Sequence, residues 1–300
     1  MADAINLFFL GKGGVGKSTS SALYSVALAD KGFKVLLVSL DPAHNQGDIF
    51  AVPISSKPVA ILPNLHVLEI DQDKWVKHYL SDVHQQLRHS YSYLSAFNLD
   101  HHFKVLKYSP GLEEYALLLA FKEITKKYRN YDYLLFDMPP TALALKFFNL
   151  PRLSLLWLEQ LLTLRREILK KKEMITTVKW GKQEKEQDKV LNRISSMQLE
   201  HTELQQIFQD RTKTLIQLVL NDDKLSLAES KRIVTGLQQI DIDLNCLVKN
   251  KTTYNVFYIT TTPGSLSSYC TGAKNMRIKP GTTNSNSASA IPAINLSNHG

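Results

Sequence analysis

A glycine-rich loop between two differently patterned segments constrains the fold of this chain more than any other feature. Ile5–Leu10 is a continuous apolar run, typical of a strand that is buried on both faces of a parallel sheet. The loop Gly11–Thr19 follows, and the pattern of Lys17–Lys31 is helical, with Gly32 as a helix stop. Lys34–Leu40 is a second apolar run. Strand, helix and strand in this order predict a right-handed crossover between parallel strands.

The same alternation continues along the chain. Helical patterns separate the later apolar runs, and one of them, Ser226–Gln239, follows an Asn-Asp-Asp turn that makes Ser226 a candidate N-cap. The sequence therefore predicts an α/β fold with a doubly wound, mainly parallel sheet. The later strands are expected at His66–Ile70, Tyr133–Phe136, Leu215–Leu220 and Leu244–Val248.

Two regions interrupt this alternation, the mostly helical Asp71–Arg129 and Leu150–Arg211, and a third region ends it. We expect one domain over residues 1–262, a mainly helical insertion at about 150–211, and a polar, mobile tail over 263–300. The insertion begins with the apolar segment Leu150–Leu164, and charged residues follow it. Arg152 and Glu159 within that segment argue for a buried or groove-lining helix and against a membrane span.

Composition limits the kinds of partner. The net charge of +8 is concentrated between Arg165 and Arg193, which we interpret as a solvated helical face, because no nucleic-acid module accompanies it. Cys246 and Cys270 are the only cysteines and cannot form a disulfide framework. The start of the chain lacks the basic region of a secretory signal. We expect a cytoplasmic protein with no specific nucleic-acid partner.

The glycine-rich loop matches the Walker A pattern and stands between a predicted strand and a predicted helix, as that motif requires. Its backbone N–H groups and the helix N-terminus are expected to bind the phosphates of ATP. Lys17 is expected to reach the β- and γ-phosphates, and Ser18 to contribute its hydroxyl oxygen to Mg²⁺. The predicted nucleotide-binding residues of the loop are Gly11, Lys12, Gly13, Gly14, Val15, Gly16, Lys17, Ser18 and Thr19.

The segment Asp41-Pro42-Ala43-His44-Asn45, together with this loop, resembles the ArsA family of arsenite-pump and tail-anchored-protein-targeting ATPases, whose first switch reads DPAHN. The resemblance implies Mg-dependent ATP hydrolysis, with Asp41 orienting or deprotonating the attacking water and with Pro42, His44 and Asn45 as switch residues. A turn-capping role for Asp41 is the alternative. A second lysine in the loop marks the deviant Walker A group, which implies a homodimer in which Lys12 acts on the partner's nucleotide.

Two later segments carry the resemblance further. Asp137 follows a buried strand and is expected to hold Mg²⁺ through water, while Pro140 and Thr141 belong to the second switch. The family reads D-T-A-P-T-G-H-T there, whereas Ala142 and Leu143 replace its glycine and histidine, so turnover is expected to be slow. Asn250 matches the family's adenine-contacting asparagine.

Four functions remain open. An arsenite-pump motor agrees with the family but not with the shortage of thiolates. A targeting factor would bind a hydrophobic helical client, or a membrane partner, in a groove that includes Leu150–Leu164. A partition or division-site ATPase would use the basic residues. A nucleotide-gated scaffold with little turnover would follow from the altered second switch.

Overall fold

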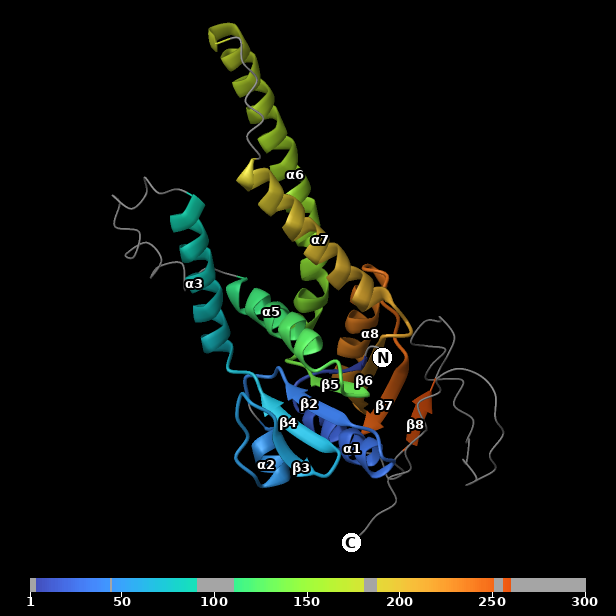
Figure 1. Cartoon of the computed structure of the whole chain (residues 1–300). Coiled ribbons are helices and arrows are strands. Elements are labelled where there is room, and N and C mark those ends of the chain that lie inside the picture. Colours follow the sequence, from blue (N-terminus) through green and yellow to red (C-terminus); the bar gives the residue numbers. More distant parts are fainter. Residues whose placement is uncertain (1–3, 44, 91–110, 181–187, 251–255, 260–300) are drawn as a thin grey trace, which may run out of the picture. The chain divides into compact units, whose positions relative to one another are not determined.

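The structure is a computed structural model that describes residues 4–43, 45–90, 111–180, 188–250 and 256–259. Contacts divide the chain into two compact units. Unit 1 comprises Met1–Asp71, Glu123–Leu145 and Gln209–Gly300, and unit 2 comprises Gln72–Lys122 and Lys146–Phe208. The helices (Figure 1) are α1 (Lys17–Asp30), α2 (Gln46–Phe50), α3 (Gln72–Ser90), α5 (Leu112–Lys127), α6 (Thr141–Trp180), α7 (Lys189–Gln209) and α8 (Lys224–Gln238).

Unit 1 is built on one eight-stranded sheet with the strand order β3-β4-β2-β5-β1-β6-β7-β8. The strands from β4 to β7 in that order pair in parallel, while β3 and β8 pair antiparallel at the two edges. This confirms the predicted α/β fold with a doubly wound, mainly parallel sheet. The strands are β1 (Ile5–Leu10), β2 (Val35–Ser39), β3 (Val59–Leu62), β4 (Leu65–Glu69), β5 (Tyr133–Asp137), β6 (Thr214–Asn221), β7 (Cys246–Asn250) and β8 (Val256–Ile259).

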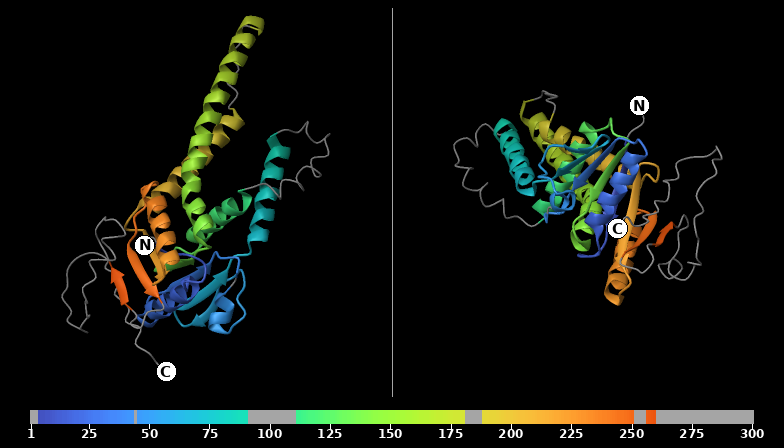
Figure 2. Two further views of the ribbon diagram at one scale, coloured as in Figure 1. Left: turned by 180° about the vertical axis from the view of Figure 1, so that it is seen from behind. Right: turned by 90° about the horizontal axis from the view of Figure 1, so that it is seen from below.

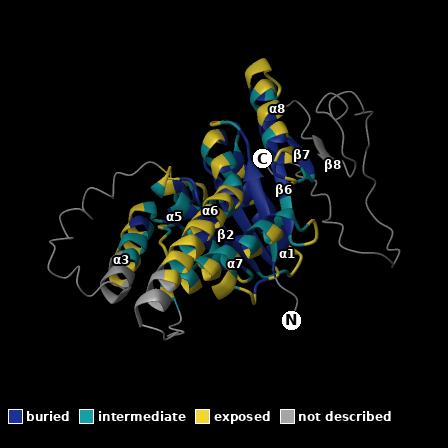
Figure 3. Ribbon diagram, turned by 90° about the horizontal axis from the view of Figure 1, so that it is seen from above, coloured by how far each residue is buried: buried dark blue, intermediate teal, exposed yellow. Residues whose placement is uncertain are grey.

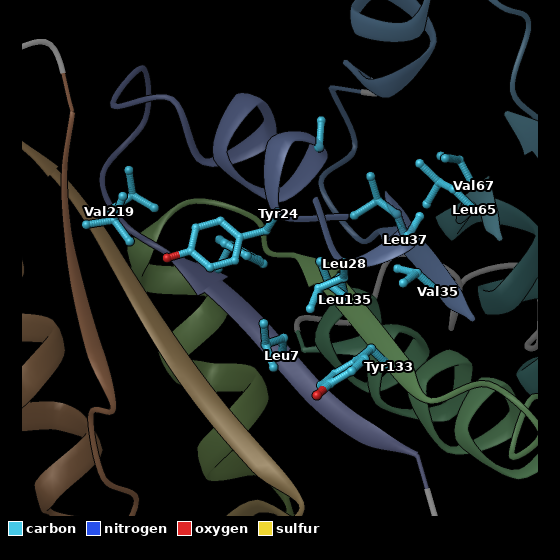
Figure 4. Close-up of a cluster of buried hydrophobic side chains, with 14 of the residues drawn as sticks. Leu7, Tyr24, Leu28, Val35, Leu37, Leu65, Val67, Tyr133, Leu135 and Val219 are labelled. Carbon is cyan, nitrogen blue, oxygen red and sulfur yellow. The ribbon is translucent and has the colours of Figure 1, made fainter. Parts of the chain in front are cut away.

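Apolar side chains cover both faces of the central strands, which is why these strands read as continuous apolar runs. On one face, Tyr24 and Leu28 of α1 pack with Leu7 and Leu135 of the sheet (Figure 4). The next residues along these strands point to the other face of the sheet and are buried as well. Phe8 and Phe136 stack there, with ring centroids 4.9 Å apart.

Two edge strands and one helix cap differ from the sequence-based expectations. Neither β3 nor β8 was expected, because each has only four residues and β3 is only partly buried, so its apolar pattern is weak. The predicted N-cap of α8 is wrong. The Asp223 carboxylate caps the helix by accepting from the Ser226 N–H at 2.7 Å, while the Ser226 hydroxyl accepts from the Asn221 N–H at 3.0 Å.

Unit 2 is helical in its described part and has its own aromatic core. Rings from three helices pack in it, from α5 (Phe121), α6 (Phe147 and Phe148) and α7 (Phe208), with centroids 5.0–5.8 Å apart. The helices α6 and α7 lie side by side (Figure 2).

The predicted apolar segment Leu150–Leu164 lies inside α6, a helix of 40 residues that contains Pro151. A proline inside a helix removes one backbone hydrogen bond. No helix in the described ranges is both long enough and apolar enough to cross a membrane. The boundaries predicted for the domain and the insertion stay predictions, and the predicted tail over 263–300 lies outside the described residues.

Candidate functional site

The glycine-rich loop runs from β1 to α1 and passes close to β6 and β7. Gly11 has φ +151°, and a Cβ there would lie 2.3 Å from the Val219 carbonyl oxygen of β6. Gly16 has φ +92°, and a Cβ there would lie 2.2 Å from Nδ2 of Asn250 in β7. Only glycine therefore fits at these two positions, for reasons of both backbone conformation and space. The loop keeps its backbone N–H groups available for phosphate oxygens.

The two lysines of this loop differ in burial. Lys17, the first residue of α1, is only 5% exposed, and its Nζ donates to the Lys12 carbonyl oxygen at 3.4 Å. Lys12 is half-buried. An ammonium held against a backbone carbonyl of the loop lies where it can exchange that acceptor for a phosphate oxygen. The predicted roles of both lysines stay predictions.

A hydrogen bond from Asn250 connects the loop to β7, the last parallel strand. Its Nδ2 donates to the Val15 carbonyl oxygen at 2.8 Å. Asn250 is the last residue of β7, so its side chain lies at the carboxyl end of the strand, where ligands of open α/β sheets bind. The predicted contact with adenine is untested, while the contact with the phosphate loop is visible here.

Asp41 lies two residues beyond the end of β2 and is 8% exposed. Its Oδ1 accepts from the Ala43 N–H at 3.1 Å, the geometry of an Asx turn. One carboxylate oxygen thus closes the turn that contains the exposed Pro42. The predicted role of Asp41 in orienting water would fall to Oδ2. Asn45 is half-buried at the start of α2, whereas His44 lies outside the described residues.

Asp137 is the last residue of β5 and is fully buried. Burial raises the pKa of this carboxyl group to about 6, and the negative charge of Asp41 raises it too. Hydrogen bonds from Ser18 and Gln46 and the positive charge of Lys17 oppose that rise in pKa. The fold therefore brings together four of the residues singled out from the sequence, although 120 positions separate Lys17 from Asp137.

Buried oxygen atoms around Asp137 fit a magnesium ion. Among the described residues, Oδ1 of Asp137, Oγ1 of Thr141 and Oε1 of Gln46 are buried and have no hydrogen-bond partner. Mg²⁺ prefers oxygen ligands and retains several waters, which can donate to such atoms. Within the described ranges no group of three His, Cys, Asp or Glu side chains could hold a metal, so a cation here would depend on a few oxygens and on phosphate.

Comparison with known proteins decides the family. The family model described as anion-transporting ATPase (ArsA ATPase) matches residues 5–256. The chain belongs to the ArsA family. This confirms the resemblance that was drawn from the loop and the two switch segments.

Three relatives illustrate the range of the family. "Putative arsenical pump-driving ATPase 2" of Aquifex aeolicus is 31% identical over 245 residues, covering 81% of this chain and 79% of the relative. An ATPase GET3 of Malassezia globosa is 29% identical over 277 residues, covering 91% and 78%. An ATPase ASNA1 homolog of Entamoeba histolytica is 29% identical over 265 residues, covering 82% and 75%. All three relatives are named as ATPases, and membership of the family supports ATPase activity for this chain.

The ArsA family chain has two further site residues that the sequence analysis missed. Gln46, fully buried, donates from Nε2 to Oδ2 of Asp137 at 3.0 Å. Glu69, at the end of β4, accepts the backbone N–H groups of Gln46 and Gly47 on Oε1, at 3.1 and 3.2 Å. The one sequence signal that could have indicated Gln46 is its position as a polar residue directly after the first switch segment, at the start of a short helix.

The segment predicted as the second switch of this ArsA family chain is continuous with a helix. Thr141 is the first residue of α6, and the Leu143 and Ala144 N–H groups donate to the Pro140 carbonyl oxygen at 3.0 and 3.2 Å. Alanine and leucine favour the helical state, whereas glycine opposes it. Ala142 and Leu143 therefore allow α6 to start four residues after Asp137.

Proposed function

We propose that this ArsA family chain hydrolyses Mg-ATP as a homodimer and uses the cycle to bind and release a hydrophobic helical client. The hydrolytic part rests on the convergence of Lys17, Ser18, Asp41 and Asp137 at the carboxyl ends of β1, β2 and β5. A bound Mg²⁺ would offset charge on the β- and γ-phosphate oxygens.

The chain's own side chains divide the remaining work. Loop N–H groups and Lys17 would bind the phosphates, and Ser18 and Asp137 would hold the metal. Asp41 holds the attacking water in line with its Oδ2. Lys12 of each protomer supplies a cation to the partner's nucleotide, which can accelerate phosphoryl transfer by roughly 10³–10⁵. Phosphate binding within one protomer needs only Lys17. A second lysine in the loop is explained if Lys12 acts on the nucleotide of a partner, and a homodimer is therefore part of this proposal.

The observation that carries the client-binding half is an apolar stripe on α6. It consists of Leu153, Trp157, Leu161, Leu164 and Ile168, all exposed, with Trp157 72% exposed. Figure 3 shows that much of α6 is exposed. At 100° per residue these five positions span about 80° of the helix circumference and about 22 Å of its length. Exposed apolar surface of this kind supports the proposal of a binding site.

The stripe is separate from the part of α6 that forms the core of unit 2. Leu158 and Leu162 are each 5% exposed and belong to that core. A groove of about 440 Å³ between α6 and α7 is lined partly by charged side chains, Arg152, Glu159 and Arg166 among them. An apolar helix would leave these charges without water, so the stripe is the surface that fits such a client.

The thiol chemistry of the described residues does not support arsenite as the cargo. Cys246 is 4% exposed, and burial raises the pKa of its thiol to about 12. Soft metalloids bind thiolates, and this thiol stays protonated at neutral pH. Cys270 lies outside the described residues. We place the protein in the cytoplasm, in keeping with its low cysteine content.

Site-specific photocrosslinking tests the client-binding half. A photoreactive residue replaces Trp157 in the stripe, and the matched control replaces Lys170, an exposed residue of α6 that lies outside the stripe. We expect a 20-residue apolar helical peptide to crosslink at position 157 and not at 170, with a yield that depends on the nucleotide. Equal yields at both positions, or none at either, would contradict client binding at the stripe.

A nucleotide-gated scaffold with negligible turnover is the second candidate. The observation in its favour is that α6 starts directly at Thr141, which leaves a short second switch. ATP hydrolysis by wild type, Asp41→Asn and Lys17→Ala separates the two candidates. Wild-type turnover above that of both variants supports the hydrolase, and equal turnover supports the scaffold.

A further inference from the structure

Gln46 is a fully buried glutamine within the nucleotide site, although glutamine is mostly exposed in proteins. It is the first residue of α2 and stands five positions after Asp41. Burial of an amide is costly unless its polar atoms are hydrogen-bonded. The contacts that compensate this cost are therefore informative about its role.

The amide nitrogen of Gln46 faces three acceptors from two other elements. Nε2 lies 3.0 Å from Oδ2 of Asp137, 3.1 Å from the Ser21 hydroxyl oxygen and 3.3 Å from the Ser18 carbonyl oxygen. The Ser21 hydroxyl gives its own proton to the Ser18 carbonyl at 2.9 Å, so it accepts from Gln46. Because all three partners are acceptors, the amide orientation is fixed with nitrogen toward Asp137.

The backbone of Gln46 is fixed independently. The Glu69 carboxylate accepts from the N–H groups of Gln46 and Gly47. The start of α2 is thus attached to β4 through its backbone, and to α1 and β5 through one side chain. A movement of the first switch segment would be transmitted to the Asp137 carboxylate through this amide.

The remaining side-chain oxygen atoms of Asp137 and Gln46 accept no hydrogen bond from the described residues. Oδ1 of Asp137 and Oε1 of Gln46 are both buried and without a hydrogen-bond partner. With Oδ2 held by the Gln46 N–H, Oδ1 is the atom left to accept from the water shell of a cation. Groups that orient a metal-site carboxylate typically affect metal affinity by about 10–100-fold.

We propose that Gln46 is a positioning residue of the metal site, which orients Asp137 and links metal affinity to the first switch segment. The inference rests on the proposed Mg-ATP site. It does not require turnover, because metal binding is measured separately from hydrolysis.

The test compares Gln46→Leu with a matched control, Gln217→Leu. Gln217 of β6 is 3% exposed and also has a buried Oε1 without a partner in the described structure, but β1 separates its strand from the strand of Asp137. Mn²⁺ binding to the ADP complex is followed by electron paramagnetic resonance, and ADP binding is measured separately with EDTA present. Thermal unfolding shows whether each variant is folded.

We expect Gln46→Leu to weaken Mn²⁺ binding by about 10–100-fold while metal-free ADP binding stays at the wild-type level. Gln217→Leu should retain wild-type Mn²⁺ affinity. A folded Gln46→Leu variant with wild-type Mn²⁺ affinity would overturn the proposal, as would equal weakening in the control. If the leucine variant does not fold, Gln46→Asn replaces it, since its polar side chain is too short to reach Asp137, and the same expectations apply.

Hydrogen exchange tests the link to the switch segment. By reciprocity, a metal whose affinity depends on α2 must also stabilise α2. We expect Mn²⁺-ADP to slow amide exchange in Gln46–Phe50 of wild type, and to do so less in the Asn or Leu variant. Equal protection in both proteins would overturn the link. Wild type that binds Mn²⁺-ADP but never hydrolyses ATP would contradict the proposed hydrolase and leave the role of Gln46 intact.

Discussion

Replacing Gly16 with alanine should be a damaging single-methyl change in the phosphate loop. The added Cβ would lie 2.2 Å from Nδ2 of Asn250, at φ +92°. The left-handed backbone costs a non-glycine residue about 1–2 kcal/mol. The Asn250 amide must also leave the Val15 carbonyl oxygen, 2.8 Å away, which costs about 0.5–1.5 kcal/mol. The sum is about 1.5–3.5 kcal/mol.

A double-mutant cycle separates these two contributions. Asn250→Ala alone should cost about 1 kcal/mol, because it removes the same hydrogen bond. In the Gly16→Ala background it should cost almost nothing, since that bond is already broken. The control is Gly13→Ala, where an added Cβ meets nothing within 4 Å, and its cost should stay below about 0.5 kcal/mol.

Native-state hydrogen exchange of β1 and β7 amides is the appropriate assay. The three tryptophans, Trp75, Trp157 and Trp180, lie in α3 and α6, so tryptophan fluorescence does not report on the sheet of unit 1. Gly16→Ala as mild as Gly13→Ala would refute the steric reasoning. Strictly additive costs for Gly16→Ala and Asn250→Ala would refute the shared hydrogen bond.

Three further predictions concern charge in the site. Asp137 has a folded-state pKa of about 6 against an ordinary 3.8, so the folded protein binds this proton more tightly than the unfolded chain does. The free energy of unfolding of the metal-free protein should therefore fall by about 3 kcal/mol as pH rises from about 4 through 6. In urea titrations, Asp137→Asn should lack this fall and should be more stable than wild type at pH 7. Asp41→Asn keeps an oxygen for the Ala43 N–H, so stability should be unchanged while ATP turnover drops by about 10²–10⁴; a loss of stability with little loss of turnover would instead show a turn-capping role. Lys12→Ala should abolish turnover and leave binding of a fluorescent ATP analogue intact, and loss of both together would remove the support for action on the partner's nucleotide.

Short-range sequence patterns were enough to predict the phosphate loop and the elements around it. The apolar run Ile5–Leu10, the glycine loop and the following helix are consecutive, so their patterns specify the backbone without reference to distant residues. The first switch at Asp41 and the buried strand ending at Asp137 were recognised for the same reason. Parallel strands with consecutive crossovers then place their carboxyl ends at one edge of the sheet, so a common site was predictable.

Only the tertiary structure decided which side chains support that site. Gln46 and Asp137 are 91 positions apart, and Asn250 and Val15 are 235 apart, so no local pattern indicates either contact. The same holds for α6, where the apolar residues of one segment divide between a core and an exposed stripe according to which face meets α7. Apolar periodicity and motif spacing specify conformations over a few turns or strands. Hydrogen bonds between distant residues depend on how the strands and helices pack, and that packing exists only in the folded chain.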